Sequence, residues 1–208
     1  HAFDHLLKKE SISETDVGSI VQDKRGRLYF GVDTYYRDRI SSALVYKDEN
    51  DDSLRVFKTP DSIVISNIVT IRTNEKDEIW LLTYTGILRI DKDRQISSFK
   101  LLDGETLAKS DYLEDIVFGS DGKLWCISRS LKLFEVEQTF DRFTMYDFPD
   151  LKDENIFRAR AVLLPDANGD LWIGSDGGLS YFDKGRNKIL KFNSGSKKQL
   201  GSLGIFSL

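Results

Sequence analysis

One short pattern recurs four times along the 208 residues and constrains the fold more than any other feature. Each copy joins an alternating apolar stretch, a polar turn, an aromatic residue within a second apolar stretch, and two further alternating stretches. The aligned aromatic residues are Tyr29, Trp80, Trp125 and Trp172, which follow one another at intervals of 51, 45 and 47 residues. Alternation with period two indicates strands and not helices. Four strands in a repeat of roughly 40–50 residues are typical of a β-propeller blade.

We therefore expect an all-β chain with about four four-stranded propeller blades. The blades are expected at residues 17–58, 67–101, 113–148 and 160–192, with partial strands of neighbouring blades at 3–9 and 202–208. The chain is then either part of a larger propeller, of about six to eight blades, or a small ring closed by strands from both ends. Because open sheet edges recruit partners, the first alternative predicts self-association as a homodimer.

The turns within the copies carry residues suited to tight hairpins. Asp121-Gly122 and Asn168-Gly169 are strong hairpin signals, because these residue types tolerate a positive φ. The second copy has Asp77-Glu78 at this place and has lost the glycine. The three prolines fall in expected loops or at strand ends, which leaves the strand N–H groups able to pair.

Composition narrows the functional classes. Thirty basic and thirty-four acidic side chains give a formal net charge of −4, without the concentrated basic stripe of a nucleic-acid-binding protein. No apolar run approaches the roughly 18 residues of a membrane span. Cys126 is the only cysteine, which excludes an internal disulfide and a thiolate metal site. Its place beside Trp125 favours a small buried apolar side chain over a nucleophile.

Nothing in the sequence resembles a catalytic centre. The two histidines, His1 and His5, both lie at the N-terminus, and most carboxylates fall on repeat-equivalent turns. Residues 166–170 resemble the opening of a calcium loop, but Leu171 and Gly177 stand where such a loop needs glycine and glutamate. We expect a hairpin turn there, and we expect no metal, cofactor or catalytic residue in this region.

Loops that differ between the copies are the expected place for a binding site, because loops carry function on a rigid scaffold. The first copy has an insertion at residues 33–39, and the corresponding loops of the next two copies span 83–85 and 128–130. If these loops share one face, the residues that converge there are Tyr35, Tyr36, Arg37, Tyr84 and Arg129. Tyrosine and arginine side chains suit an oligosaccharide, particularly an acidic one. The alternative is that they are ordinary exposed loop residues, and the tryptophans are expected to pack between blades.

Residues 168–183 carry a family resemblance. The two-component-regulator propeller repeat is similar to this run, which reads Asn168-Gly169-Asp170-Leu171-Trp172-Ile173-Gly174-Ser175-Asp176-Gly177-Gly178-Leu179-Ser180-Tyr181-Phe182-Asp183. The third copy matches through Asp121–Trp125 but has Cys126-Ile127-Ser128 where the family favours Ile-Gly-Thr, and the first has Tyr29 in place of tryptophan. The resemblance implies the periplasmic sensor region of a membrane-anchored histidine kinase, often a hybrid with a response regulator. Many such sensors detect carbohydrate fragments.

Three functions follow as hypotheses. The first is a periplasmic ectodomain of an inner-membrane sensor kinase that binds a carbohydrate fragment. The second is a protein-interaction propeller with no small ligand. The third is a propeller enzyme such as a lyase or glycosidase, which the positions of the histidines disfavour.

Overall fold

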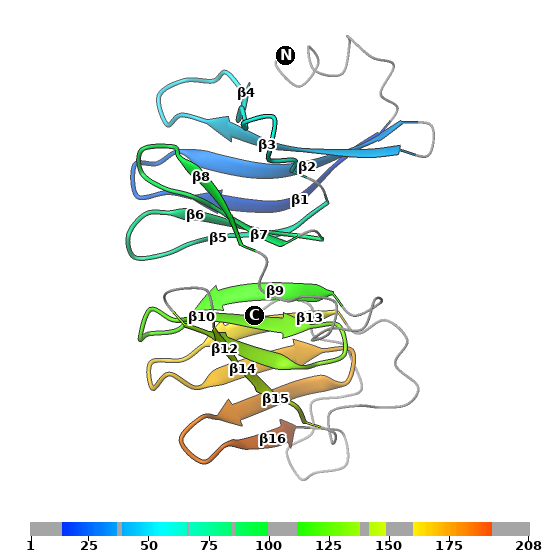
Figure 1. The fold of residues 1–208 in the computed structure, drawn as a ribbon, viewed down its shortest axis with the longest axis vertical. Coiled ribbons are helices and arrows are strands. Elements are labelled where there is room, and N and C mark those ends of the chain that lie inside the picture. The colour runs from blue at the N-terminus through cyan, green and yellow to red at the C-terminus, as the bar shows by residue number, and fades with distance from the viewer. Residues whose placement is uncertain are drawn as a thin grey trace. The chain divides into compact units, whose positions relative to one another are not determined.

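A computed structural model of the protein describes residues 14–36, 39–65, 67–84, 86–99, 112–137, 142–148 and 160–192, without the side chains of 14, 15, 34–36 and 39–41. The elements in these ranges are sixteen strands in four four-stranded antiparallel sheets (Figure 1). The chain divides into two compact units, His1–Lys100 and Leu101–Leu208, and each contains two sheets. The partial strands expected at 3–9 and 202–208, and both histidines, lie outside the described residues.

The first unit holds two sheets whose strands pair in chain order. One contains β1 (Glu14–Gln22), β2 (Leu28–Tyr36), β3 (Arg39–Lys47) and β4 (Arg55–Val56). The other contains β5 (Ile68–Thr73), β6 (Ile79–Thr83), β7 (Gly86–Ile90) and β8 (Ile96–Phe99).

The second unit repeats this arrangement. One sheet contains β9 (Leu113–Phe118), β10 (Leu124–Ser128), β11 (Leu133–Val136) and β12 (Phe143–Tyr146). The other contains β13 (Ala161–Pro165), β14 (Leu171–Ser175), β15 (Gly178–Asp183) and β16 (Lys188–Phe192). A four-stranded antiparallel meander is the topology of a propeller blade, which confirms the predicted fold class.

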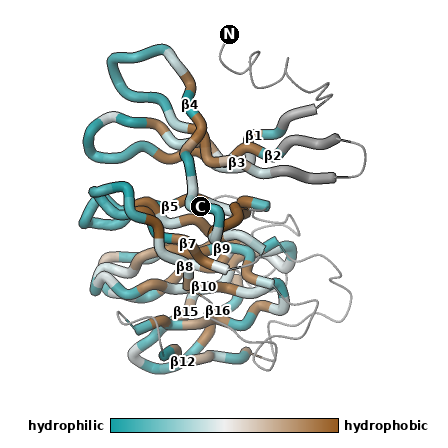
Figure 2. The backbone as a smooth tube through the Cα atoms, turned by 45° about the horizontal axis from the view of Figure 1, so that its top comes forward, coloured by the Kyte–Doolittle hydropathy of each residue, from teal (hydrophilic) through white to brown (hydrophobic). Residues whose placement is uncertain are grey.

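Apolar side chains between the two sheets of each unit form its core. Figure 2 shows hydrophobic residues concentrated along the strands and hydrophilic residues at the turns. In the first unit Tyr29 and Leu44 pack with Ile71 of the next sheet. In the second, the ring of Trp125 lies edge-on to that of Phe182, with 6.0 Å between centroids. The interpretation of this tryptophan as a packing residue between blades is confirmed.

The repeated turn uses a positive φ in every sheet. Gly26, Gly122 and Gly169 have φ of 78°, 73° and 84°, and Asp77 adopts 62° where the glycine is missing. Asp is one of the few residue types that tolerate this region. The carboxylate of Asp77 also accepts a hydrogen bond from the backbone N–H of Lys24 at 2.8 Å, which joins the two sheets of the first unit.

The insertion expected as a loop at residues 33–39 is largely strand. β2 continues to Tyr36 and β3 begins at Arg39, and the two strands pair as far as Tyr36 opposite Arg39. Aromatic and β-branched residues in this stretch favour extended backbone, so the sequence lengthens the hairpin instead of opening a loop. The insertion prediction was therefore wrong about the local structure.

Within the described ranges, no helix is long and apolar enough to cross a membrane.

Candidate ligand-binding groove

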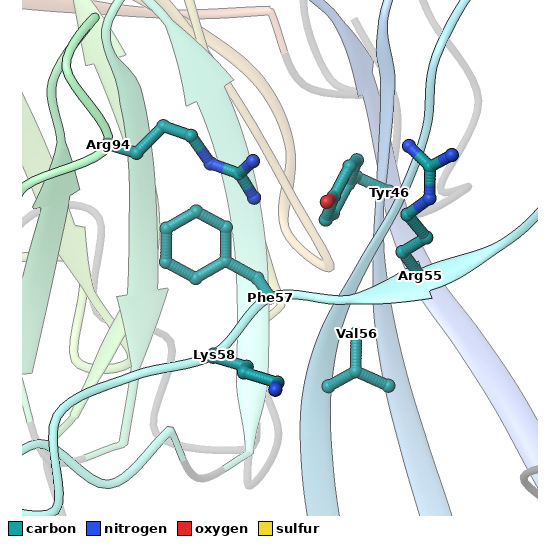
Figure 3. A pocket seen from close by; sticks show the side chains of 6 residues that line it. All are labelled: Tyr46, Arg55, Val56, Phe57, Lys58 and Arg94. Carbon is teal, nitrogen blue, oxygen red and sulfur yellow. The ribbon is translucent and has the colours of Figure 1, made fainter.

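A groove in the first unit combines charged and aromatic side chains from both of its sheets. It lies where β3, β4 and the residues after β4 meet the turn between β7 and β8, and its volume is about 590 Å³. The residues that line it are Tyr46, Arg55, Val56, Phe57, Lys58 and Arg94 (Figure 3). Among these six described residues three are cations and none is an acid, so they offer positive charge.

Five of these residues belong to β3, to β4 or to the residues that follow β4. Tyr46 pairs with Arg55 across β3 and β4, and paired residues point to the same face of a sheet. Phe57 is held beside them because its backbone N–H donates to the carbonyl of Leu44 at 2.7 Å. Both rings are nearly buried, Tyr46 at 7% exposure and Phe57 at 5%. Their faces are therefore not available for a sugar ring to stack on, and the polar groups at the rim must do the binding.

Arg94 comes from the second sheet and occupies a strained position. It lies in the β7–β8 turn with a φ of 63°, where the backbone N–H donates to the carbonyl of Asp91 at 2.9 Å. The corresponding turn of the fourth sheet has Asn187 at this position, with a φ of 47°. Asparagine and glycine suit a left-handed conformation, whereas for arginine it costs about 1 kcal/mol.

Two aromatic rings hold the Arg94 guanidinium in place. Its central carbon lies 4.7 Å from the ring centroid of Tyr46 and 5.2 Å from that of Phe57. Figure 3 shows the guanidinium beside the Phe57 ring and directed towards Tyr46. Cation–π contacts of this kind contribute about 0.5–1 kcal/mol each at exposed sites, enough to offset the backbone cost. A hydrogen bond from Arg94 is the main cause that lowers the pKa of the Tyr46 phenol.

The cations of the groove differ in how far they are neutralised. Arg55 pairs with Asp48 at 2.7 Å and also with Asp51. Lys58 and Arg94 form no ion pair with a carboxylate in the part of the chain that the structure describes. These two side chains are consequently the cations of the groove that could meet an anionic ligand.

The described lining of the groove includes none of the five residues predicted from the sequence. Tyr35 and Tyr36 belong to the end of β2, where only the backbone is described, and Arg37 is outside the described residues. Tyr84 lies between β6 and β7 and is 55% exposed. Arg129 follows β10, and its guanidinium donates to the Tyr112 hydroxyl and lies 5.1 Å from the centre of that ring. Their convergence on one face stays a prediction.

Sequence reasoning missed the groove because its parts are distant in the chain. Tyr46 and Arg94 are 48 residues apart, about one whole repeat, and only the packing of the two sheets brings them together. The positive φ of Arg94 points to the groove, because strained residues cluster at functional sites, but only the structure shows it.

A second charged cluster, in the second unit, has a structural role. The Glu135 carboxylate accepts hydrogen bonds from Lys123 at 2.5 Å, Lys184 at 2.8 Å and Tyr146 at 3.0 Å. Lys184 belongs to the β15–β16 turn, so the cluster joins the two sheets. Burial alone would raise the pKa of Glu135, but the hydrogen bonds from Lys123, Lys184 and Tyr146 outweigh it and the pKa is lowered.

The sequence that resembles a calcium loop forms the expected turn. One Asp166 oxygen accepts the backbone N–H groups of Asn168 at 2.8 Å and Asp170 at 3.1 Å. The Tyr181 hydroxyl lies 3.0 Å from the other oxygen of Asp166 and 2.7 Å from Asp170, and it donates to one of them. No cluster of three or more His, Cys, Asp or Glu side chains suited to a metal ion occurs among the described residues.

No protein-family model and no curated protein matches the sequence. Solved structures do match in fold. Two structures of the extracellular domain of BT4673 from B. thetaiotaomicron are similar over 87% and 85% of this chain, with TM-scores of 0.57 and 0.55 and identities of 15% and 16%. BT4673 is described as a one-component system with the first structure and as a hybrid two-component system with the second.

Two further structures of different function share the fold. A GH74 xyloglucanase from Xanthomonas campestris is similar over 85% of this chain, with a TM-score of 0.62 and 12% identity. PorZ, a surface component of the type-IX secretion system of Porphyromonas gingivalis, is similar over 86%, with a TM-score of 0.58 and 15% identity. The chain spans only 27–30% of the length of these structures. At such identities the likeness shows the fold, which is that of β-propeller blades and is shared with the extracellular domain of BT4673.

Proposed function

We propose that the chain is part of the periplasmic region of an inner-membrane sensor histidine kinase and that it binds a carbohydrate fragment. The observation that carries the proposal is the groove in which Arg94 is held over Tyr46 and Phe57. Residues with a strained backbone cluster at functional sites, and Arg94 has no carboxylate partner among the described residues. The fold of the BT4673 extracellular domain supports the place of such a site in a signalling protein.

The position of the groove suits signalling. Its lining comes from two sheets, so a ligand that contacts both Lys58 and Arg94 stabilises one arrangement of the sheets over another. A ligand shifts an equilibrium only by the difference in its affinity for the two states. In the proposed mechanism the arrangement of the sheets that the ligand stabilises favours one of two arrangements of a homodimeric sensor.

Isothermal titration of the chain with soluble oligosaccharides tests the proposal. We expect saturable heat with at least one sugar and no change in that sugar, as judged by mass spectrometry after incubation. Absence of binding across neutral and acidic sugars contradicts the proposal. Cleavage of a sugar supports a propeller enzyme, such as a lyase or glycosidase, instead. The xyloglucanase of similar fold is one such enzyme.

A second candidate function, a protein-interaction propeller, is favoured by one face of the fourth sheet. Leu164, Trp172, Tyr181 and Leu190 are paired side by side across β13, β14, β15 and β16. The two leucines are each 42% exposed. Trp125 occupies the position of Trp172 in the preceding sheet, and it is 1% exposed because the fourth sheet covers it.

The occupant that fits this face is another blade of the same repeat, supplied in the isolated protein by a second copy of the chain. Two side chains of the third sheet join it to the fourth: Asp115 accepts the backbone N–H of Leu163, and Glu135 pairs with Lys184. The residues at these two positions differ in the fourth sheet. Val162 stands where the third sheet has Asp115, and Tyr181 stands where it has Glu135, when the sheets are aligned on their tryptophans. Contact across this face therefore depends on apolar side chains.

A further inference from the structure

We propose that the groove binds the anionic group of an acidic saccharide, a carboxylate or sulfate, with Arg94 as the main ligand and Lys58 as the second cation. The inference rests on the proposed function and adds the chemical class of the ligand. It goes beyond the loop residues predicted from the sequence, because the described lining of the groove includes none of them.

The charges around the groove favour an anionic ligand. Arg55 is held by Asp48 and Asp51, so its charge is compensated within the protein. The Arg94 guanidinium lies against the rings of Tyr46 and Phe57, and no carboxylate of the described residues pairs with it. A planar guanidinium forms two parallel hydrogen bonds with a carboxylate or sulfate, and such charge-assisted bonds are about twice as strong as neutral ones.

The aromatic rings act as a support and not as a sugar platform. Tyr46 and Phe57 are at most 7% exposed and contact the guanidinium, whereas Arg94 itself is exposed and accessible to a ligand. This pre-organisation lowers the entropy lost on binding, because the two ring contacts restrict the side chain before a ligand binds. It also predicts that a neutral sugar gains little from the groove.

The test compares two forms of one oligosaccharide that differ only in charge. The probes are an oligogalacturonate and the same oligomer with its carboxylates methyl-esterified, with a sulfated disaccharide as the second anionic source. We expect the acid form to bind the chain at least tenfold more tightly than the ester, and to lose affinity as salt is raised from about 0.05 to 0.3 M. Binding of the sulfated sugar but not of the galacturonate assigns the groove to sulfate.

Arg94→Gly is the informative variant, because glycine adopts the positive φ without strain and the turn is preserved. We expect it to fold with unchanged thermal stability within a few degrees and to lose at least tenfold in affinity for the acid form. Arg94→Lys keeps the charge but not the planar fork and should bind with intermediate affinity. Arg186→Gly, an 81% exposed arginine in the corresponding turn of the fourth sheet, is the matched control and should bind like the wild type.

Two outcomes overturn the inference. If the acid and ester forms bind equally, the groove does not select an anion, although the proposed function stands. If Arg94→Gly is folded and binds the acid form as tightly as the wild type, the anion lies elsewhere on the protein. Failure of every sugar, neutral or charged, overturns the proposed function itself.

Discussion

The carboxylate of Asp115, in β9, accepts a hydrogen bond from the backbone N–H of Leu163, in β13, at 2.9 Å. Its other oxygen accepts the N–H of Ile116 at 2.8 Å, and the side chain is 2% exposed. In the first unit the hydroxyl of Ser19 accepts the N–H of Ile71 at 3.0 Å in the same way. Both residues lie ten positions before the aligned aromatic residue of their sheet. A side-chain acceptor at this repeat position thus joins one blade to the next.

Replacement of Asp115 by alanine should destabilise the second unit. The change leaves the buried N–H of Leu163 without its acceptor, and loss of a buried hydrogen bond to a charged group costs about 2–3 kcal/mol. Ser19→Ala, which removes the equivalent neutral bond, should cost about 1 kcal/mol. Urea unfolding followed by fluorescence measures both. A loss below about 0.5 kcal/mol for Asp115→Ala would show that the bond between the sheets contributes little.

Stability of the second unit should fall in acid because of Glu135. Its pKa is lowered in the folded protein, so its ionised form contributes stability above the ordinary pKa near 4.5. That contribution is lost as the pH falls through the lowered value and the carboxylate is protonated. Measurement of urea midpoints from pH 7 to pH 3 should show the decline. In Glu135→Gln the loss of stability in acid should be smaller than in the wild type. If the two proteins lose stability equally as the pH falls, Glu135 is not the cause.

Removal of one cation from this cluster should be less harmful than removal of the carboxylate. Lys184→Met leaves Glu135 bonded to Lys123 and Tyr146, and we expect a loss of about 1–2 kcal/mol. Glu135→Leu leaves two lysines beside an apolar residue, and we expect about 3 kcal/mol. Thermal unfolding at pH 7 ranks the two variants. The reverse order would mean that the lysine, and not the carboxylate, organises the cluster.

Cys126 should be unreactive in the folded protein. The thiol is fully buried, and burial, together with the charge of Asp115, raises its pKa far above neutrality. Because the thiolate is the reactive form, a disulfide reagent at pH 8 should not label the native chain. In 6 M guanidinium chloride one thiol should react completely. Rapid labelling under native conditions would place Cys126 in a more open environment.

The apolar face of the fourth sheet should cause self-association of the isolated chain. Leu190→Lys places a charge on this face, and we expect sedimentation velocity to show a shift from larger species towards monomer. Met145→Lys changes a residue of similar exposure, 45%, in β12 of the other sheet and is the control. Equal behaviour of the two variants would mean that self-association does not use this face.

The repeat pattern predicted the fold because each part of it has a local cause. Alternating apolar residues predicted the strands, and Asp121-Gly122 and Asn168-Gly169 predicted turns that do have positive φ at the glycines. The aromatic position predicted the core, as the burial of Tyr29, Trp80 and Trp125 shows. Even the acceptor position of Ser19 and Asp115 could have been found by alignment of the four copies.

The groove could not be predicted in the same way. It depends on how two sheets pack, and no local pattern places the turn of Arg94 beside Tyr46 and Phe57. The long β2–β3 hairpin was missed because residues 33–39 were compared with short turns in the other copies. A difference in length between repeats indicates a structural difference, but it does not say whether the extra residues form a loop or extend a strand.

The most direct test of the account is to locate the ligand on the protein. A titration of ¹⁵N-labelled chain with an oligogalacturonate, followed by two-dimensional NMR, reports which backbone amides respond. We expect the largest shifts at residues 46, 55–58 and 91–95, with Tyr84 and Arg129 little affected and the response absent in Arg94→Gly. Shifts concentrated around Tyr84 and Arg129, or no saturable shifts anywhere, would contradict a ligand site in this groove.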